Sequence, residues 1–188
     1  MNWRIKAGIV SGWGILQIIS LISCAKNEAP LPKPLFQSNT GKWTASLYVP
    51  EDEPASVGSY TIVISAAGKE VQRIASNRDG TVVQMWIVDL ARDGITDIVV
   101  WTQSTGSGSY GVLDLYQHTK GKFISMPMHD LEESHLIGYN GHDTYTIEND
   151  KILRAFPVYE EGDVNAEPTG GVRKLEYDLQ KAFWISIE

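Results

Sequence analysis

Residues 97–117 read DIVVWTQSTGSGSYGVLDLYQ, two apolar runs joined by glycine, serine and threonine. Within them, Gly106–Gly111 has the spacing G-x-G-x-x-G, which in dinucleotide-binding proteins leads from a strand into a helix. Residues 112–117 instead alternate with a period of two, which is typical of a strand. Strands on both sides predict a β-hairpin with its loop at residues 104–111, and they argue against a nucleotide site.

The same period of two recurs along residues 43–188, for example at 43–49 and again at 183–187. Turn sequences such as ARDG and KGK separate the runs. About eight to ten short strands with regular turns predict an all-β, antiparallel fold, either a sandwich or a barrel. Nothing in the sequence indicates an internal repeat or a second domain.

The N-terminal residues have the features of an export signal. A basic start and an apolar run lead to Leu21-Ile22-Ser23-Cys24, which resembles a bacterial lipobox. We therefore expect residues 1–23 to be a lipoprotein signal peptide and Cys24 to be lipidated. The alternative is a buried N-terminal helix with an incidental cysteine. Residues 24–42 contain three prolines and are expected to form a lipid-anchored tether to the domain at 43–188.

The charge balance excludes one class of partner. The chain has a net charge of -7, and without Arg4 and Lys6 its 14 basic residues face 23 acidic ones, which gives -9. A body with this acidic excess is a poor nucleic-acid binder, because phosphate contacts need basic residues, so no nucleic acid is expected and cationic partners are favoured. Cys24 is the sole cysteine, so no internal disulfide can form.

The hairpin loop itself admits two interpretations, a slack tip or a contact loop. Tyr110 is a large aromatic residue among small ones, and tyrosine recurs in binding loops. With Thr105, Ser107, Gly108 and Ser109 it would form a narrow ridge of hydroxyl donors. Glycines allow positive φ and close backbone approach, so the ridge would suit a cleft lined with carboxylates.

Ser107-Gly108-Ser109-Tyr110 resembles the Ser-Gly-x-Tyr motif of the bacterial periplasmic inhibitors of invertebrate-type (i-type) lysozyme. The stretch 86–111 is also similar to that family, in its strand, Asp/Gly turn, strand and loop. So is the stretch 138–179, in its Gly-His-Asp, Phe-Pro-x-Tyr, Gly-Asp and Gly-Gly elements. The resemblance extends over roughly residues 43–188.

This resemblance implies an antiparallel β-sandwich whose protruding loop, residues 104–111, plugs the active-site cleft of a host or competitor i-type lysozyme. It implies that Ser107 and Tyr110 contact the catalytic carboxylates, that the chain is an inhibitor without a cofactor, and that it can form a homodimer. A periplasmic location follows. The lipobox departs from the family and adds a membrane anchor, with the outer membrane favoured because Ala25 is not an Asp-type retention signal. The alternative function is a lipid-anchored envelope module that binds glycan or another protein, and the third class left open is an unrecognised hydrolase.

Three acids, Asp89, Asp93 and Asp97, resemble a calcium loop in which Ala91 replaces the second acid. A tight turn between two strands is the favoured interpretation, and calcium binding stays open. The four histidines lack metal-ligand spacing, so no metal site is expected.

The remaining polar segments give no catalytic residues. The adjacent acids Glu132-Glu133 and Glu160-Glu161 are expected to be solvated rather than catalytic, and no serine lies in a nucleophile elbow. The long loop 160–171 is either a second contact strip or a surface connection.

Overall fold

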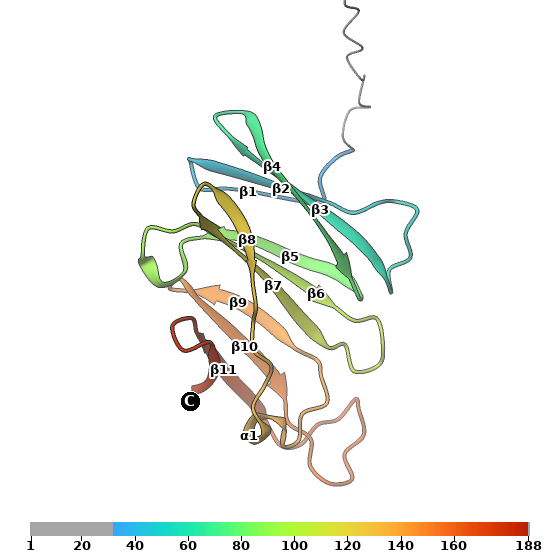
Figure 1. Ribbon diagram of the computed structural model, residues 1–188. Coiled ribbons are helices and arrows are strands. Elements are labelled where there is room, and N and C mark those ends of the chain that lie inside the picture. The colour runs from blue at the N-terminus through green and yellow to red at the C-terminus, as the bar shows by residue number, and fades with distance from the viewer. Residues whose placement is uncertain (1–31, 188) are drawn as a thin grey trace, which may run out of the picture. The chain divides into compact units, whose positions relative to one another are not determined.

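The computed structural model describes residues 32–187, and they form an almost entirely β structure (Figure 1). Two short helical segments accompany the strands, the 3₁₀ turn η1 (Leu90–Arg92) and α1 (Glu133–Leu136). The strands are β1 (Phe36–Asn39), β2 (Trp43–Tyr48), β3 (Gly58–Ala66), β4 (Lys69–Arg78), β5 (Thr81–Val88), β6 (Asp97–Gln103), β7 (Gly111–Thr119), β8 (Lys122–Met126), β9 (Thr144–Glu148), β10 (Lys151–Pro157), β11 (Val172–Asp178) and β12 (Phe183–Ile187).

Every pair of neighbouring strands is antiparallel, which confirms the predicted all-β antiparallel class. The strands form three sheets with the orders β1-β2-β3-β4, β5-β6-β7-β8 and β12-β11-β10-β9. The described residues thus hold twelve strands rather than eight to ten. In Figure 1 the sheet β5–β8 lies between the other two, so the sandwich has three layers.

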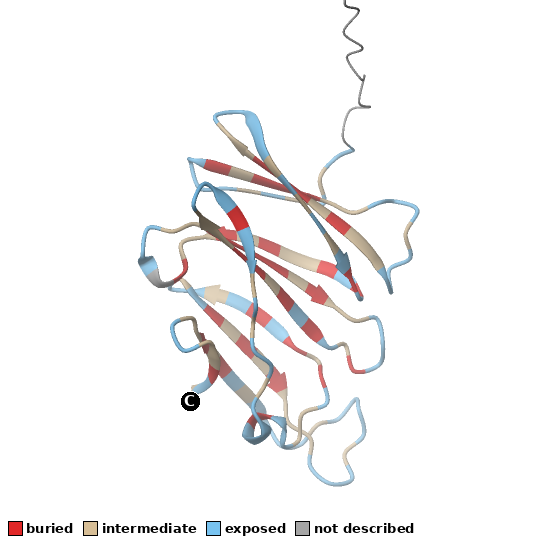
Figure 2. Cartoon of the chain, in the orientation of Figure 1, coloured by how far each residue is buried: buried red, intermediate tan, exposed pale blue. Residues whose placement is uncertain are grey.

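The middle sheet is buried on both faces. In β6, Ile98 and Val100 belong to the core shared with β1–β4, whereas Val99 belongs to the core shared with β9–β12. All three side chains are fully buried. Figure 2 shows buried residues, in red, recurring along the central strands. The continuous run Ile-Val-Val is the sequence signal of a strand covered on both sides, because neither face can then be polar.

Part of the segment expected to be a tether belongs to a sheet. Residues 36–39, which follow the prolines of that segment, form β1 and pair with β2. Phe36 packs against the first core, and this apolar contact joins the segment to the sheet. The signal peptide 1–23 and Cys24 lie outside the described residues. Within residues 32–187, no helix combines the length and hydropathy needed to cross a membrane.

Candidate functional site

The predicted hairpin loop connects β6 to β7. The two strands pair antiparallel up to Gln103 and Gly111. The loop is closed by Ser104 and Tyr110, because the Ser104 N–H donates to the Tyr110 carbonyl at 2.8 Å and the Tyr110 N–H donates to Ser104 Oγ at 2.9 Å. The strand on each side excludes the helix that a dinucleotide turn would require.

The predicted contact residues differ in how they meet solvent. Thr105 and Ser107 are exposed at the crest of the loop, and Ser109 is half-buried. Gly108 is buried, so it contributes little surface to a partner. Among residues 32–187, Ser107 Oγ has no hydrogen-bond partner, which leaves this hydroxyl available to one.

Tyr110 lies down on the loop and still keeps 44% of its surface exposed. A Cβ at Gly108 would overlap the Tyr110 ring, so the glycine provides the space in which the ring sits. The ring packs edge-on against Tyr139 with centroids 5.8 Å apart, and its hydroxyl donates to Asn140 Oδ1 at 3.3 Å. One face of the tyrosine is thus fixed while the rest is presented to solvent.

The left-handed residue of the loop is Ser109, with φ 43°. Gly106 and Gly108, which could adopt a positive φ, do not do so. Close packing, rather than backbone conformation, explains the glycine at Gly108.

A second segment, residues 138–143, runs beside the loop. The His142 N–H donates to the Gly108 carbonyl at 2.6 Å. Gly141 has φ 85°, and a Cβ there would overlap that same carbonyl oxygen. Only glycine meets both conditions, because its lack of a Cβ permits the left-handed conformation and the close approach.

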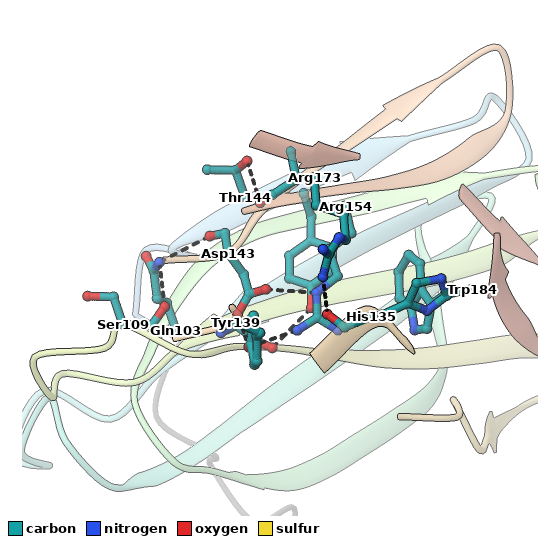
Figure 3. Close-up of polar contacts among 12 residues, drawn as sticks. Gln103, Ser109, His135, Tyr139, Asp143, Thr144, Arg154, Arg173 and Trp184 are labelled. Atoms are coloured by element: carbon teal, nitrogen blue, oxygen red, sulfur yellow. Dashed lines mark hydrogen bonds and ion pairs between the residues drawn. The ribbon is translucent and has the colours of Figure 1, made fainter. Parts of the chain in front are cut away.

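A buried ion pair anchors both segments (Figure 3). Arg154 Nε donates to Asp143 Oδ1 at 2.7 Å, and the Asp143 side chain is fully buried. The other oxygen, Oδ2, accepts the Tyr139 hydroxyl at 2.7 Å and the N–H of Gly111, the last residue of the loop, at 2.8 Å. Burial and then the bond to Asp143 raise the pKa of Tyr139, so it stays a protonated donor at neutral pH.

Gln103 completes the anchor at the other end of the loop. Its side-chain amide donates to the Ser109 carbonyl at 3.1 Å and to the Asp143 carbonyl at 3.2 Å (Figure 3). Both ends of the loop are therefore tied to residue 143.

A third segment reaches the crest from loop 160–171. Asn165 Nδ2 donates to the Ser107 carbonyl at 2.8 Å. Asn165 Oδ1 accepts from Asn140 Nδ2 at 3.1 Å and lies 3.1 Å from His142 Nε2. Residues 165 and 107 are 58 positions apart, so the contact joins distant parts of the chain.

The pattern of β10 contains a signal for this anchor that the sequence analysis did not use. Ile152, Arg154 and Phe156 share the inward face of β10, and the two apolar residues are fully buried. A charged residue at an inward position needs a buried partner, and that pattern points to an acid nearby. The sequence around Asn165 contains no pattern that indicates its contact with Ser107.

Two acids of the calcium-like stretch accept hydrogen bonds from backbone N–H groups of the same turn. Asp89 accepts the N–H groups of Asp93 and Gly94 at 3.0 Å each, and Asp97 Oδ2 accepts that of Leu90 at 3.0 Å. No group of three or more metal-ligating side chains arranged to hold an ion occurs within the described part of the chain.

Comparison with known proteins gives a family match. Residues 41–133 match the model of the PliI family, described as periplasmic lysozyme inhibitor of I-type lysozyme, and they make up about half of the chain. The matched segment contains β2–β8 and the hairpin loop, whereas β9–β12 lie beyond it. A search of curated proteins found no match.

Two solved structures are similar to part of the chain. Aeromonas hydrophila PliI, crystallised in complex with Meretrix lusoria lysozyme, is 24% identical with a TM-score of 0.40, over 45% of this chain and 74% of that one. PliI-Ah of the same species, described as a periplasmic lysozyme inhibitor of I-type lysozyme, is 22% identical with a TM-score of 0.42, over 50% of this chain and 92% of that one.

Proposed function

The chain belongs to the family of periplasmic lysozyme inhibitors of I-type lysozyme, and we propose that it inhibits such an enzyme by inserting loop 104–111 into the active-site cleft. The chain is therefore an inhibitor and not an enzyme. One observation carries the proposed mechanism: the exposed hydroxyl of Ser107 and the half-exposed Tyr110 stand on a loop tied at both ends to Asp143, the acid of the buried ion pair.

The chemistry of the target suits these groups. Glycosidases cleave with a pair of carboxyl groups on either side of the scissile bond. Hydroxyls donate strongly to ionised carboxylates, so Ser107 and Tyr110 can each engage one while the loop excludes the sugar. The Tyr110 hydroxyl makes only a 3.3 Å bond within the chain, so little is lost when it turns to a partner.

The other loop residues have different roles in this proposal. Thr105 is exposed and flanks the crest, where it meets the wall of the cleft. Gly108 is buried below the Tyr110 ring and supports it without touching the enzyme directly. Ser109 holds the left-handed turn that brings Tyr110 back over the loop.

A cell-wall clearing assay tests the function. Residues 25–188, purified, are added separately to lysozymes of the i, c and g types. Loss of i-type activity alone is expected. Undiminished clearing by all three would contradict the inhibitor and favour an envelope module that binds glycan or another protein.

The family is periplasmic, and we propose further that Cys24 carries a lipid that anchors the chain to the membrane, with the outer membrane favoured. The lipobox-like sequence Leu21-Ile22-Ser23-Cys24 supports this. Mass spectrometry of the mature N-terminus should show a diacylglyceryl cysteine. An unmodified N-terminus elsewhere in the chain would rule the anchor out.

We propose, finally, that the body forms a homodimer, as the resemblance to this family implies. Light scattering of residues 25–188 after gel filtration should give twice the monomer mass. A monomer mass across the concentration range would contradict it.

A further inference from the structure

We infer that Asn165 is a positioning residue for the inhibitory loop: from outside the segment matched by the family, it fixes the backbone of Ser107 and thereby the place from which the Ser107 hydroxyl projects. The inference deepens the proposed function and rests on it where lysozyme is concerned. The positioning itself is a property of the free protein and can be measured without the enzyme.

Asn165 joins three segments through one side chain. Its amide nitrogen donates to the Ser107 carbonyl at 2.8 Å, while its amide oxygen accepts from Asn140 at 3.1 Å and lies 3.1 Å from His142 Nε2. The opposite amide orientation would place an NH₂ group against the NH₂ of Asn140 and an oxygen against the Ser107 carbonyl. The partners thus dictate one orientation of the side chain.

Asn165 is itself held by its own loop. The Tyr159 hydroxyl donates to the Asn165 carbonyl at 2.9 Å. Asp163 accepts the N–H groups of Glu160 and Thr169 at 2.8 Å each, and the Thr169 hydroxyl at 2.9 Å, which closes the loop below Asn165. An anchored side chain can transmit a fixed position to the crest.

The crest has few other restraints. The carbonyls of Gly106 and Gly108 accept from Ser109 and His142, but the carbonyl of Ser107 is bound by Asn165. Because Ser107 Oγ has no partner among residues 32–187, the place from which the hydroxyl projects depends on the Ser107 backbone alone. Fixing that backbone before binding lowers the entropy lost when the loop enters a cleft.

Two substitutions at one position separate this role from general stability. Asn165→Ala removes every contact, whereas Asn165→Asp keeps the acceptor for Asn140 and His142 and loses the donor to Ser107. Asn77→Ala is the matched control, since Asn77 is exposed on β4 and its side chain makes no hydrogen bond among the described residues.

The test measures amide hydrogen exchange of residues 104–110 in the free protein, the melting temperature, and the inhibition constant for an i-type lysozyme. Both Asn165 variants should exchange faster at 104–110 and inhibit about tenfold more weakly, as the loss of one hydrogen bond with its ordering implies. Their melting temperatures should stay close to that of the control.

Unchanged loop exchange in both variants would overturn the inference. So would an inhibition constant for Asn165→Asp equal to that of the wild type, because the Ser107 contact would then have no consequence. If the wild type inhibits no i-type lysozyme, the proposed function fails, while the exchange comparison still decides whether Asn165 positions the loop.

Discussion

At the scale of single residues, the two hydroxyls of the loop differ in their support. Ser107 projects from a backbone held at its carbonyl, whereas Tyr110 is held through its ring by Gly108 and Tyr139. Their substitution should therefore separate the loss of a hydroxyl from the loss of an aromatic contact.

Ser107→Ala and Tyr110→Ala should each weaken binding to i-type lysozyme by roughly 1–4 kcal/mol, because central contact residues dominate interface energies. Tyr110→Phe keeps the ring and should lose only the part that the hydroxyl contributes. Inhibition constants give these values, with Ser125→Ala on the exposed side of β8 as the control. Inhibition that is unchanged in both alanine variants would remove the loop from the mechanism.

Arg154→Met should destabilise the protein by about 3–5 kcal/mol, because Asp143 is left as an uncompensated buried charge. The control is Arg92→Met, which removes an exposed pair with Asp150 and should cost about 0–1 kcal/mol. Urea unfolding followed by tryptophan fluorescence measures both. Equal losses in the free energy of unfolding would show that the buried Asp143–Arg154 pair stabilises the protein no more than an exposed pair does.

Asp97 introduces a pH dependence, because burial raises the pKa of its carboxyl from 3.8 to about 6. The folded state then holds its proton to a higher pH than the unfolded state does, so this group lowers stability as pH rises from about 4 to 6. Asp97→Asn removes that slope. The free energy of unfolding of Asp97→Asn minus that of the wild type should therefore rise between about pH 4 and pH 6. A difference that stays constant over this interval would contradict the shifted pKa. The exposed Asp79→Asn serves as the control.

At the scale of elements, the hairpin and the segment 138–143 behave as one unit. The carbonyl of Gly108 accepts from His142, and Gly141 lies so close that a Cβ would overlap the same oxygen. The loop therefore depends on a segment that follows it by some thirty residues in sequence.

Gly141→Ala should displace the loop and reduce inhibition at least tenfold. Gly41→Ala is a close control, because φ is 85° at Gly141 and 84° at Gly41, but nothing surrounds Gly41 within 4 Å. Both variants carry the strain of a left-handed alanine, about 1 kcal/mol. Only Gly141→Ala also pushes the Gly108 carbonyl away from residue 141. Equal inhibition constants for Gly141→Ala and Gly41→Ala would therefore contradict this close packing.

The sequence predicts local features of this unit well and distant ones poorly. Alternation after Gly111 correctly indicates a strand and hence a hairpin. The left-handed residue is Ser109 and not a glycine, because turn composition does not determine which residue takes the positive φ. The Asn165 contact with Ser107 depends on how two sheets pack, and no periodicity of either segment encodes it.

At the scale of the whole molecule, the middle and third sheets have different roles with respect to the loop. The middle sheet carries the loop, and the family match covers it together with β2–β4. The third sheet, β9–β12, lies beyond that match and contributes Arg154 of the buried pair, with Asp143 just before β9 and Asn165 between β10 and β11. This layer thus supports the loop from outside the matched segment.

The sequence predicted the antiparallel all-β class from its alternation, but it missed the third layer. Ile98, Val99 and Val100 are all buried because β6 is covered on both faces, and a period of two by itself does not indicate a second covered face. The sequence also failed to indicate β1, because the prolines near residue 36 suggested a flexible tether. Composition alone does not show that Phe36 pairs with β2 and packs against the first core.

Amide hydrogen exchange of the chain bound to i-type lysozyme tests the central claim most directly. If the loop enters the cleft, amide exchange of residues 104–111 should be much slower in the complex than in the free protein. The change in exchange rate should be smaller in the sheet β1–β4. A stable complex in which residues 104–111 exchange as fast as in the free protein would contradict the account.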